Sequence, residues 1–186
     1  MRRKNVTRHM IKDYISQALL LLMQKKAYSQ ITIQEITKEA GVNRSTYYRN
    51  FTSKETIIQY VFSEIIDRFD ELSGETPELS MPECISEMFD HFYEYRQTFL
   101  TIHRAGLSHM LLDAFNEYFR KLCGPEDDGH LLYEIAYHTG GIFNIFILWL
   151  DQDMQMPPES VAEAAVEHLF RDGIFDRLSK GDEKTV

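Results

Sequence analysis

The chain has 186 residues, 44% of them hydrophobic, and a formal net charge of −9 at pH 7. This length allows one large domain or a small domain joined to a larger one, with apolar residues enough for a sizeable core. The longest apolar run, residues 142–150, is too short to span a bilayer, and no apolar segment follows the basic start. Because the two cysteines, Cys84 and Cys123, also lie far apart, we expect a cytoplasmic protein without a membrane span, a disulfide framework or a zinc site.

The charge is distributed unevenly along the chain. Residues 1–60 carry a net charge of +7, whereas residues 61–186 carry −16. A basic segment on an acidic remainder indicates that only the first part meets a polyanion such as DNA, because the acidic part is repelled from it. Chance variation between two parts of one protein is the alternative explanation.

Helical periodicity is found in nearly every segment, beginning with a predicted helix over residues 7–26. A second helix is predicted to start after Thr32, because Thr32 and Glu35 have the spacing of a capping box. This helix is expected to end at Ala40, since Gly41 adopts turn conformations that other residues resist.

Further helices follow in chain order. A short third helix is predicted over residues 45–51, and a fourth, capped by Thr52 or Ser53, extends to about Leu72. The polar loop at 73–78 is the strongest boundary signal in the chain. Beyond it, helices are predicted over residues 81–95, 97–104, 108–122, 130–150 and 158–178, and residues 179–186 are expected to be disordered. The sequence therefore predicts an all-α fold of about nine helices.

Residues 31–51 have the pattern of a helix-turn-helix, in which two short helices are joined by a glycine turn. Its apolar anchors are Ile36, Ala40, Val42, Tyr47 and Phe51. The second helix leaves six residues without a role in the core, namely Arg44, Ser45, Thr46, Tyr48, Arg49 and Asn50. Arginine can pair with guanine edges, threonine can meet a thymine methyl, and the other types can hold phosphates. Lys54 can meet a phosphate together with the positive N-terminus of the next helix.

This stretch resembles the DNA-binding domain of the TetR/AcrR family of bacterial regulators, over about residues 5–55. The resemblance rests on Ala40-Gly41-Val42, Thr46, Tyr48, Phe51 and Ser53-Lys54-Glu55. It implies a DNA-binding domain at 1–55 and a helical effector-binding and dimerisation domain at 56–186, linked by the helix at 53–72. The DNA contacts that it implies are Thr32, Gln34, Arg44, Ser45, Thr46, Tyr48, Arg49, Asn50 and Lys54. Tyr47 departs from the family pattern, which usually has leucine or another aliphatic residue there, and its hydroxyl needs a partner if it packs inward.

Several of these contacts have a purely structural alternative. Thr32 also fits the role of a helix cap, and Gln34 and Asn50 also fit solvated surface. Lys54 also fits an ordinary exposed lysine.

The acidic part of the chain, residues 81–178, is rich in phenylalanine, tyrosine, methionine and histidine. Such residues suit an adaptable apolar pocket with a few polar groups, and they suit a plain helical core, which we favour for most of them. The candidate effector-pocket residues are Phe92, Tyr95, Phe99, His103, Met110, Phe115, Tyr137 and His138. Glu134 and His138 stand four residues apart, but no third ligand has suitable spacing, so we expect no metal site and no cofactor.

The segment 140–150 is apolar nearly all round, which predicts a helix that is buried on both sides. Preceded by Tyr133 and Tyr137, it resembles the Firmicutes-type TetR C-terminal domain, in which a Gly-Gly pair precedes a tryptophan. The resemblance implies that the last two helices form a four-helix dimer interface. The candidate interface residues are Gly140, Gly141, Phe143, Ile147, Val166 and Phe170. A central core helix is the alternative, and both descriptions can hold.

Together these features predict a regulator of transcription that is not an enzyme. We expect a homodimer that binds a palindromic operator in double-stranded DNA and represses transcription until a small effector binds. One alternative is an activator that is controlled by a protein partner. A remote alternative is an acidic helical enzyme, but the sequence has no nucleophile with a plausible base, no phosphate loop and no HExxH motif.

Overall fold

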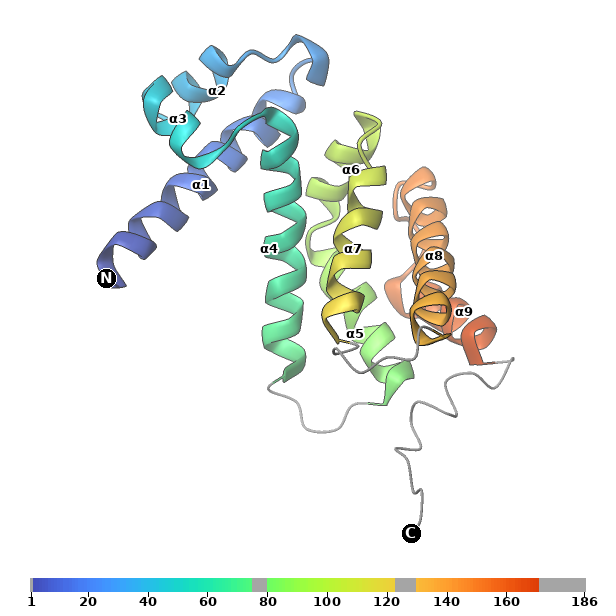
Figure 1. Cartoon of the computed structure of the whole chain (residues 1–186). Helices are drawn as coiled ribbons and strands as arrows, with labels where there is room; N and C mark the ends of the chain where they lie inside the picture. The colour runs from blue at the N-terminus through green and yellow to red at the C-terminus, as the bar shows by residue number, and fades with distance from the viewer. Residues whose placement is uncertain (1, 75–79, 123–129, 171–186) are drawn as a thin grey trace. The chain divides into compact units, whose positions relative to one another are not determined.

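The computed structural model describes residues 2–74, 80–122 and 130–170 of the chain (Figure 1). The helices in these ranges are α1 (Arg2–Met23), η1 (Tyr28–Gln30, a 3-10 turn), α2 (Ile33–Glu39), α3 (Arg44–Asn50), α4 (Lys54–Gly74), α5 (Met81–Glu94), α6 (Arg96–Arg104), α7 (His109–Leu122), α8 (His130–Asp151) and α9 (Pro158–Phe170). The described ranges contain nine α-helices and no strand, which confirms the predicted all-α fold. No helix in them combines the length and the apolar character that crossing a membrane requires.

Most helix ends lie within one or two residues of their predicted positions, whereas α1 begins earlier, at Arg2. The short turn η1 was not predicted, because three residues are too few for a periodic pattern. The expected disordered tail at 179–186 and the last predicted helical residues, 171–178, lie outside the described residues.

The predicted start of α2 is confirmed in detail. The Thr32 hydroxyl accepts a hydrogen bond from the Glu35 backbone N–H, and the Glu35 carboxylate accepts one from the Thr32 backbone N–H at 2.9 Å. The helix ends where Gly41 takes a φ of +65°, a conformation that favours glycine. This cap and this turn fix the direction in which the chain enters α3.

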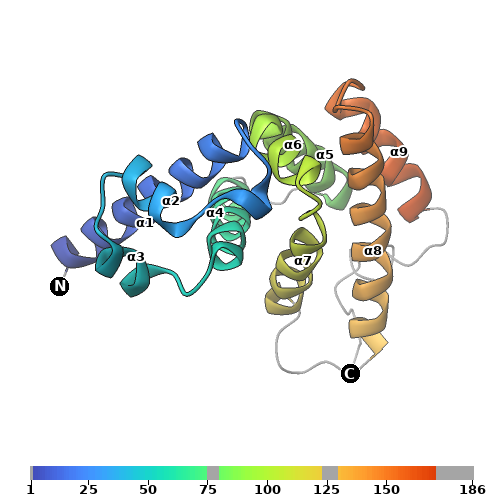
Figure 2. The same ribbon diagram turned by 90° about the horizontal axis from the view of Figure 1, so that it is seen from above.

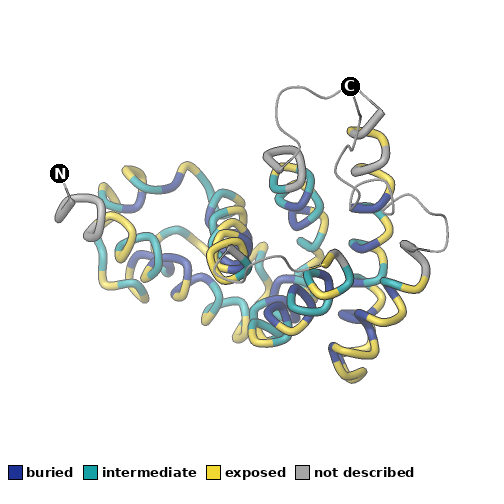
Figure 3. The backbone as a smooth tube through the Cα atoms, turned by 90° about the horizontal axis from the view of Figure 1, so that it is seen from below, coloured by how far each residue is buried: buried dark blue, intermediate teal, exposed yellow. Residues whose placement is uncertain are grey.

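The described helices form two compact units. The first lies within Met1–Glu64 and Gln97–Ala114, and the second within Ile65–Arg96 and Phe115–Val186, so that α4 runs from one unit into the other. In both units buried and exposed positions alternate along the helices, as expected for amphipathic helices with one face in a core (Figure 3). The predicted functional boundary near residue 55 is a separate question and stays a prediction.

The first unit packs α1, α2 and α3 against one another. Ile15 and Leu19 of α1, Ile36 of α2 and Tyr47 of α3 are all fully buried in its core. Each of the three aliphatic side chains contributes about 1.5–3 kcal/mol through the apolar surface that it removes from water. Because the two short helices share this core with the longer α1, tertiary packing holds them in place.

The second unit is centred on aromatic side chains. The α9 helix packs against α5 and α8, and α8 and α9 lie side by side in both views (Figures 1 and 2). The Phe89 and Trp149 rings meet edge to face at 5.7 Å, and Phe146 contacts both. The Trp149 indole N–H donates to the Met156 carbonyl at 2.9 Å, so it also fixes the loop between α8 and α9.

Candidate DNA-binding interface

The α3 helix is oriented by two aromatic side chains on its inner face. Tyr47 is fully buried and Phe51, the C-cap residue, is 4% exposed. The Phe51 ring packs edge to face on the Tyr60 ring of α4 at 5.6 Å, and the Lys12 ammonium of α1 lies 4.5 Å from the Tyr60 ring centroid. These contacts leave the opposite face of α3 toward solvent.

Asn43 caps the N-terminus of α3, which begins at Arg44, one residue before the predicted start. Its side-chain oxygen accepts hydrogen bonds from the Thr46 backbone N–H and the Ser45 hydroxyl, both at 2.8 Å. The cap satisfies backbone donors that a helix start leaves free. Ser45 is exposed but already has a partner within the chain.

Three large side chains on the outer face of α3 are exposed, namely Arg44, Tyr48 and Arg49. The Arg44 guanidinium lies 6.0 Å from the centroid of the Tyr48 ring, one turn away. The Arg49 side chain is held along α3, because its Nε donates a hydrogen bond to the Ser45 carbonyl at 3.3 Å. The structure therefore brings two cations and one amphipathic ring together on one short surface, the arrangement that phosphate and base contacts need.

Two other candidates, Asn50 and Lys54, are held by bonds within the chain. The Asn50 amide donates to the Thr46 carbonyl at 2.8 Å, and its side-chain oxygen is buried without a hydrogen-bond partner among the described residues. The Lys54 ammonium donates to the carbonyls of Tyr28 and Ile31 at 2.8 and 2.9 Å. Lys54 is thus neither an ordinary exposed lysine nor free to extend, and its contact with a phosphate stays a prediction.

At the other end of the motif, Thr32 and Gln34 are both exposed at the start of α2. The cap role of Thr32 is observed, since its hydroxyl also donates to a Glu35 carboxylate oxygen at 2.8 Å. Hydrogen bonds from Lys26 and from Thr32 lower the pKa of Glu35 to about 2. The DNA contacts of Thr32 and Gln34 stay predictions.

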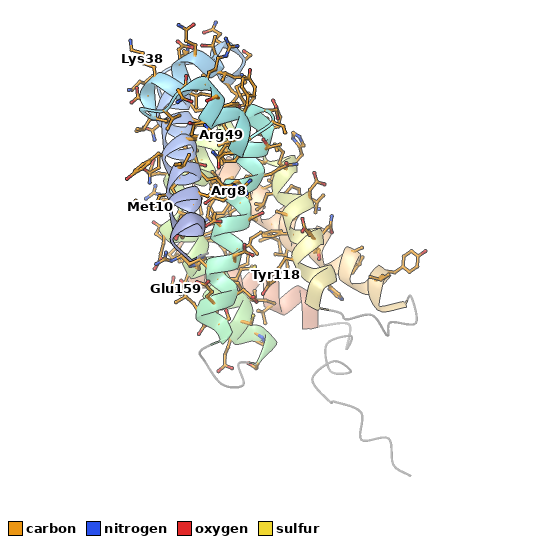
Figure 4. The ribbon with its side chains drawn as sticks, turned by 60° about the vertical axis from the view of Figure 1, so that its left-hand side comes forward. Arg8, Met10, Lys38, Arg49, Tyr118 and Glu159 are labelled. Carbon is orange, nitrogen blue, oxygen red and sulfur yellow. The ribbon has the colours of Figure 1, made fainter. Side chains whose placement is uncertain are left out.

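Lys38, which was not among the predicted DNA contacts, is an exposed lysine in the last turn of α2 whose side chain extends outward (Figure 4). Its charge was visible in the sequence, but the direction of its side chain depends on how α2 packs. It adds a cation to the same unit as Arg49, which Figure 4 also labels.

The structure shows where the Tyr47 side chain and its hydroxyl lie. The residue packs inward, as the aliphatic residue of the family pattern is expected to, and its hydroxyl is buried without a hydrogen-bond partner among the described residues. Burial raises the pKa of Tyr47 to about 12, and the hydroxyl stays protonated at neutral pH. This side chain belongs to the core of the unit.

The candidate effector-pocket residues are divided between the two units. Phe99, His103 and Met110 belong to the first, and Phe92, Tyr95, Phe115, Tyr137 and His138 belong to the second. Phe92 stacks on Phe115 with centroids 5.6 Å apart, which brings two of them together. Tyr137, in contrast, is 70% exposed. A pocket formed by these residues stays a prediction, and the Glu134 side chain lies outside the described residues.

The candidate dimer-interface residues lie mostly on one side of α8. Gly141 is exposed and Gly140, Phe143 and Ile147 are half-buried, as is Val166 of α9, whereas the side chain of Phe170 lies outside the described residues. A methyl group added at either glycine would meet no atom within 4 Å. Tyr133 and Leu148 of α8, which were not among the predicted interface residues, are also apolar and exposed, at 80% and 57%.

Comparison with known proteins agrees with the helix-turn-helix. Residues 15–61 match the model of the bacterial regulatory proteins of the tetR family. The HTH-type transcriptional regulator YxbF of Bacillus subtilis (strain 168) is 24% identical over 178 residues, which are 89% of this chain and 47% of the relative. The chain thus spans about half the length of this curated relative.

Two solved structures share the fold. A TetR transcriptional regulator from Streptococcus agalactiae 2603V superposes with a TM-score of 0.60 at 20% identity, over 91% of this chain and 99% of the other. The dihydroxyacetone kinase operon activator DhaS superposes with a TM-score of 0.56 at 18% identity, over 87% and 95%. Residues 15–61 thus match the tetR family of bacterial regulatory proteins, and most of the chain is similar to a curated HTH-type transcriptional regulator.

Proposed function

We propose that this chain is a ligand-responsive repressor that binds a palindromic operator as a homodimer through α3. The observation that carries the proposal is the outer face of α3, where Arg44, Tyr48 and Arg49 are exposed above a buried Tyr47 and Phe51. Such a face can enter a major groove while the core behind it keeps the helix in position. The net charge of +7 on residues 1–60 supports approach to the DNA backbone.

The homodimer is supported by the outer side of α8. Tyr133, Tyr137, Gly141 and Leu148 are all exposed and recur at intervals of about four or seven residues, so they form one apolar stripe along the helix. A stripe of this kind on a soluble chain is typical of a protein–protein interface. Two copies joined by a two-fold axis place two α3 helices on half-sites about one DNA turn apart or somewhat more.

The effector is proposed to bind in the helical part beyond residue 55 and to act on the DNA-binding helices through α4. By linkage, an effector that releases DNA binds the free regulator more tightly than the DNA-bound regulator. Activation of transcription is the second candidate function, because DhaS, which has a similar fold, is an activator by its name. A transcription assay with the purified protein on a promoter that carries its operator separates the two signs.

The first experiment is affinity selection of sheared genomic DNA on the purified protein at near-physiological salt, followed by sequencing. We expect one or a few inverted repeats. Binding to the selected operator is then measured for Arg44→Ala, with Arg68→Ala as the matched control, because Arg68 is an exposed arginine on α4 outside the motif. We expect Arg44→Ala to lose about 1–3 kcal/mol of binding free energy and some sequence preference. Unchanged operator affinity in Arg44→Ala contradicts the α3 assignment.

A separate experiment tests the dimer. Leu148→Glu places a charge in the exposed stripe of α8, and Met10→Glu, which changes an exposed apolar residue of α1, is the control (Figure 4). We expect the first variant to sediment as a monomer at concentrations where the wild type and the control are dimers. A Leu148→Glu variant that remains fully dimeric excludes this stripe as the interface.

A further inference from the structure

A group of three potential metal ligands lies in the first unit, on the α1 and α4 helices. His9 and Asp13 are one turn apart on α1, and Glu64 faces them from α4. The His9 Nε2 is 3.1 Å from a Glu64 carboxylate oxygen and 4.0 Å from an Asp13 carboxylate oxygen. One ligand atom from each of the three residues lies within 4.8 Å of the other two.

The chemistry of these three side chains favours a transition metal. One imidazole nitrogen with two carboxylate oxygens is a donor set that Zn²⁺ accepts, at distances of about 2.0–2.2 Å. Magnesium and calcium prefer oxygen donors alone, so the imidazole selects against them. The three side chains are 57%, 39% and 37% exposed, which gives an ion and a remaining water ligand access from solvent.

Electrostatics also favours a cation at this place. The carboxylates of Asp13 and Glu64 carry like charges, and one oxygen of each lies within 4.8 Å of the other. The Lys12 ammonium of α1 lies over the Tyr60 and Phe51 rings. A divalent ion between the carboxylates would offset their repulsion more fully than a protonated imidazole does.

The Tyr60 side chain contacts the Asp13 ligand and also lies close to His9, since its hydroxyl is 3.4 Å from the His9 Nδ1. Its hydroxyl donates to one Asp13 oxygen at 2.7 Å, and the other Asp13 oxygen is the one that faces His9. Hydrogen bonds of this kind orient the ligands of metal sites.

We propose that His9, Asp13 and Glu64 bind one divalent transition-metal ion of the Zn²⁺ type, which joins α1 to α4 in the unit that carries the helix-turn-helix. The inference rests on these side chains and not on the proposed operator or effector. A bound ion stabilises the folded chain by mass action, in proportion to the logarithm of its concentration above the dissociation constant.

The test uses full-length, tag-free protein that has been treated with a chelator and dialysed. Co²⁺ is the probe, because its visible absorption reports both binding and coordination, and Zn²⁺ is then used to displace it. The variants are His9→Ala and Glu64→Gln, and the matched control is His109→Ala, an exposed histidine of α7 outside the group. Far-ultraviolet circular dichroism verifies that every variant keeps its helix content.

We expect the wild type and His109→Ala to bind one more equivalent of Co²⁺ than either ligand variant, and Zn²⁺ to displace it. The difference in bound Co²⁺ between the wild type and a ligand variant reports this site alone, because metal ligands elsewhere in the chain are the same in both proteins. Tyr60→Phe keeps all three ligands, and we expect it to lower the affinity of the site for Co²⁺ by about 10-fold. Identical Co²⁺ binding curves for the wild type, His9→Ala and Glu64→Gln would overturn the proposal, as would a wild type that binds no Co²⁺.

Discussion

Replacing Tyr47 by phenylalanine tests whether this side chain is part of the core and not of the DNA-binding face. The hydroxyl is buried and has no hydrogen-bond partner among the described residues. A buried hydroxyl without a partner costs about 1–3 kcal/mol in proteins. Tyr47→Phe removes the hydroxyl and keeps the ring, together with its edge-to-face contact with Tyr48 at 5.2 Å. We therefore expect the free energy of unfolding to rise by about 1 kcal/mol, at the lower end of this range.

The assay is thermal and urea unfolding, followed by circular dichroism. A gain of 1 kcal/mol corresponds to a Tm increase of about 2–4 °C for a chain of this size. Tyr60→Phe is the matched control with the opposite sign, because the Tyr60 hydroxyl donates to Asp13 and its loss costs about 1 kcal/mol. Operator affinity of Tyr47→Phe should equal that of the wild type. A lower Tm, or a clear loss of operator affinity, would refute the reasoning.

Three further predictions concern single residues, namely Glu35, Gly141 and Lys54. Because the pKa of Glu35 is about 2 in the folded chain and ordinarily 4.5, its ionised form stabilises the fold above pH 4.5 and this contribution is lost as the pH falls towards 2. Glu35→Gln should therefore flatten the dependence of Tm on pH in that window. Gly141→Ala should lower the fraction of dimer measured by sedimentation, because the added methyl group prevents the α8 helices of two copies from approaching closely. An unchanged dimer fraction would place Gly141 outside the dimer interface. Lys54→Met should cost about 1–3 kcal/mol of stability through its lost bonds to Tyr28 and Ile31, and unchanged unfolding in urea would contradict this role.

The parts of the fold that could be predicted are those that short sequence patterns determine. The capping box of Thr32 and Glu35 and the turn at Gly41 depend on residues within four positions of each other. The exposure of Arg44 and Arg49 follows from the burial of Tyr47 on the same short helix. Local chemistry decides these features, so the sequence alone was sufficient for them.

The features that could not be predicted depend on residues distant in the sequence. Lys54 bonds to the carbonyl of Tyr28, 26 positions earlier, and nothing in the pattern around Lys54 indicates that an acceptor lies there. Glu64 approaches His9 across 55 positions, so only the pair of His9 and Asp13, one turn apart, was visible in advance. The register between α1 and α4 decides these contacts, and helical periodicity does not specify that register.

Contacts around η1 connect neighbouring segments of the first unit, the unit in which the short α3 helix also lies. Seven residues are too few for a stable isolated helix, so the position of α3 comes from the packing around it. Lys26, which follows α1, bonds to Glu35 of α2 at 2.6 Å, and Tyr28 of η1 bonds to Glu55 of α4 at 2.8 Å. The Lys54 ammonium of α4 also donates to the Tyr28 carbonyl, so that η1 and the residues before it are joined to α2 and α4. Substitutions in this network should act on folding, whereas substitutions on the outer face of α3 should act on DNA binding. Tyr28→Phe removes the bond to Glu55 at a residue that is not a predicted DNA contact. Comparing it with Arg44→Ala in the unfolding and operator assays therefore separates the support of the motif from its recognition surface.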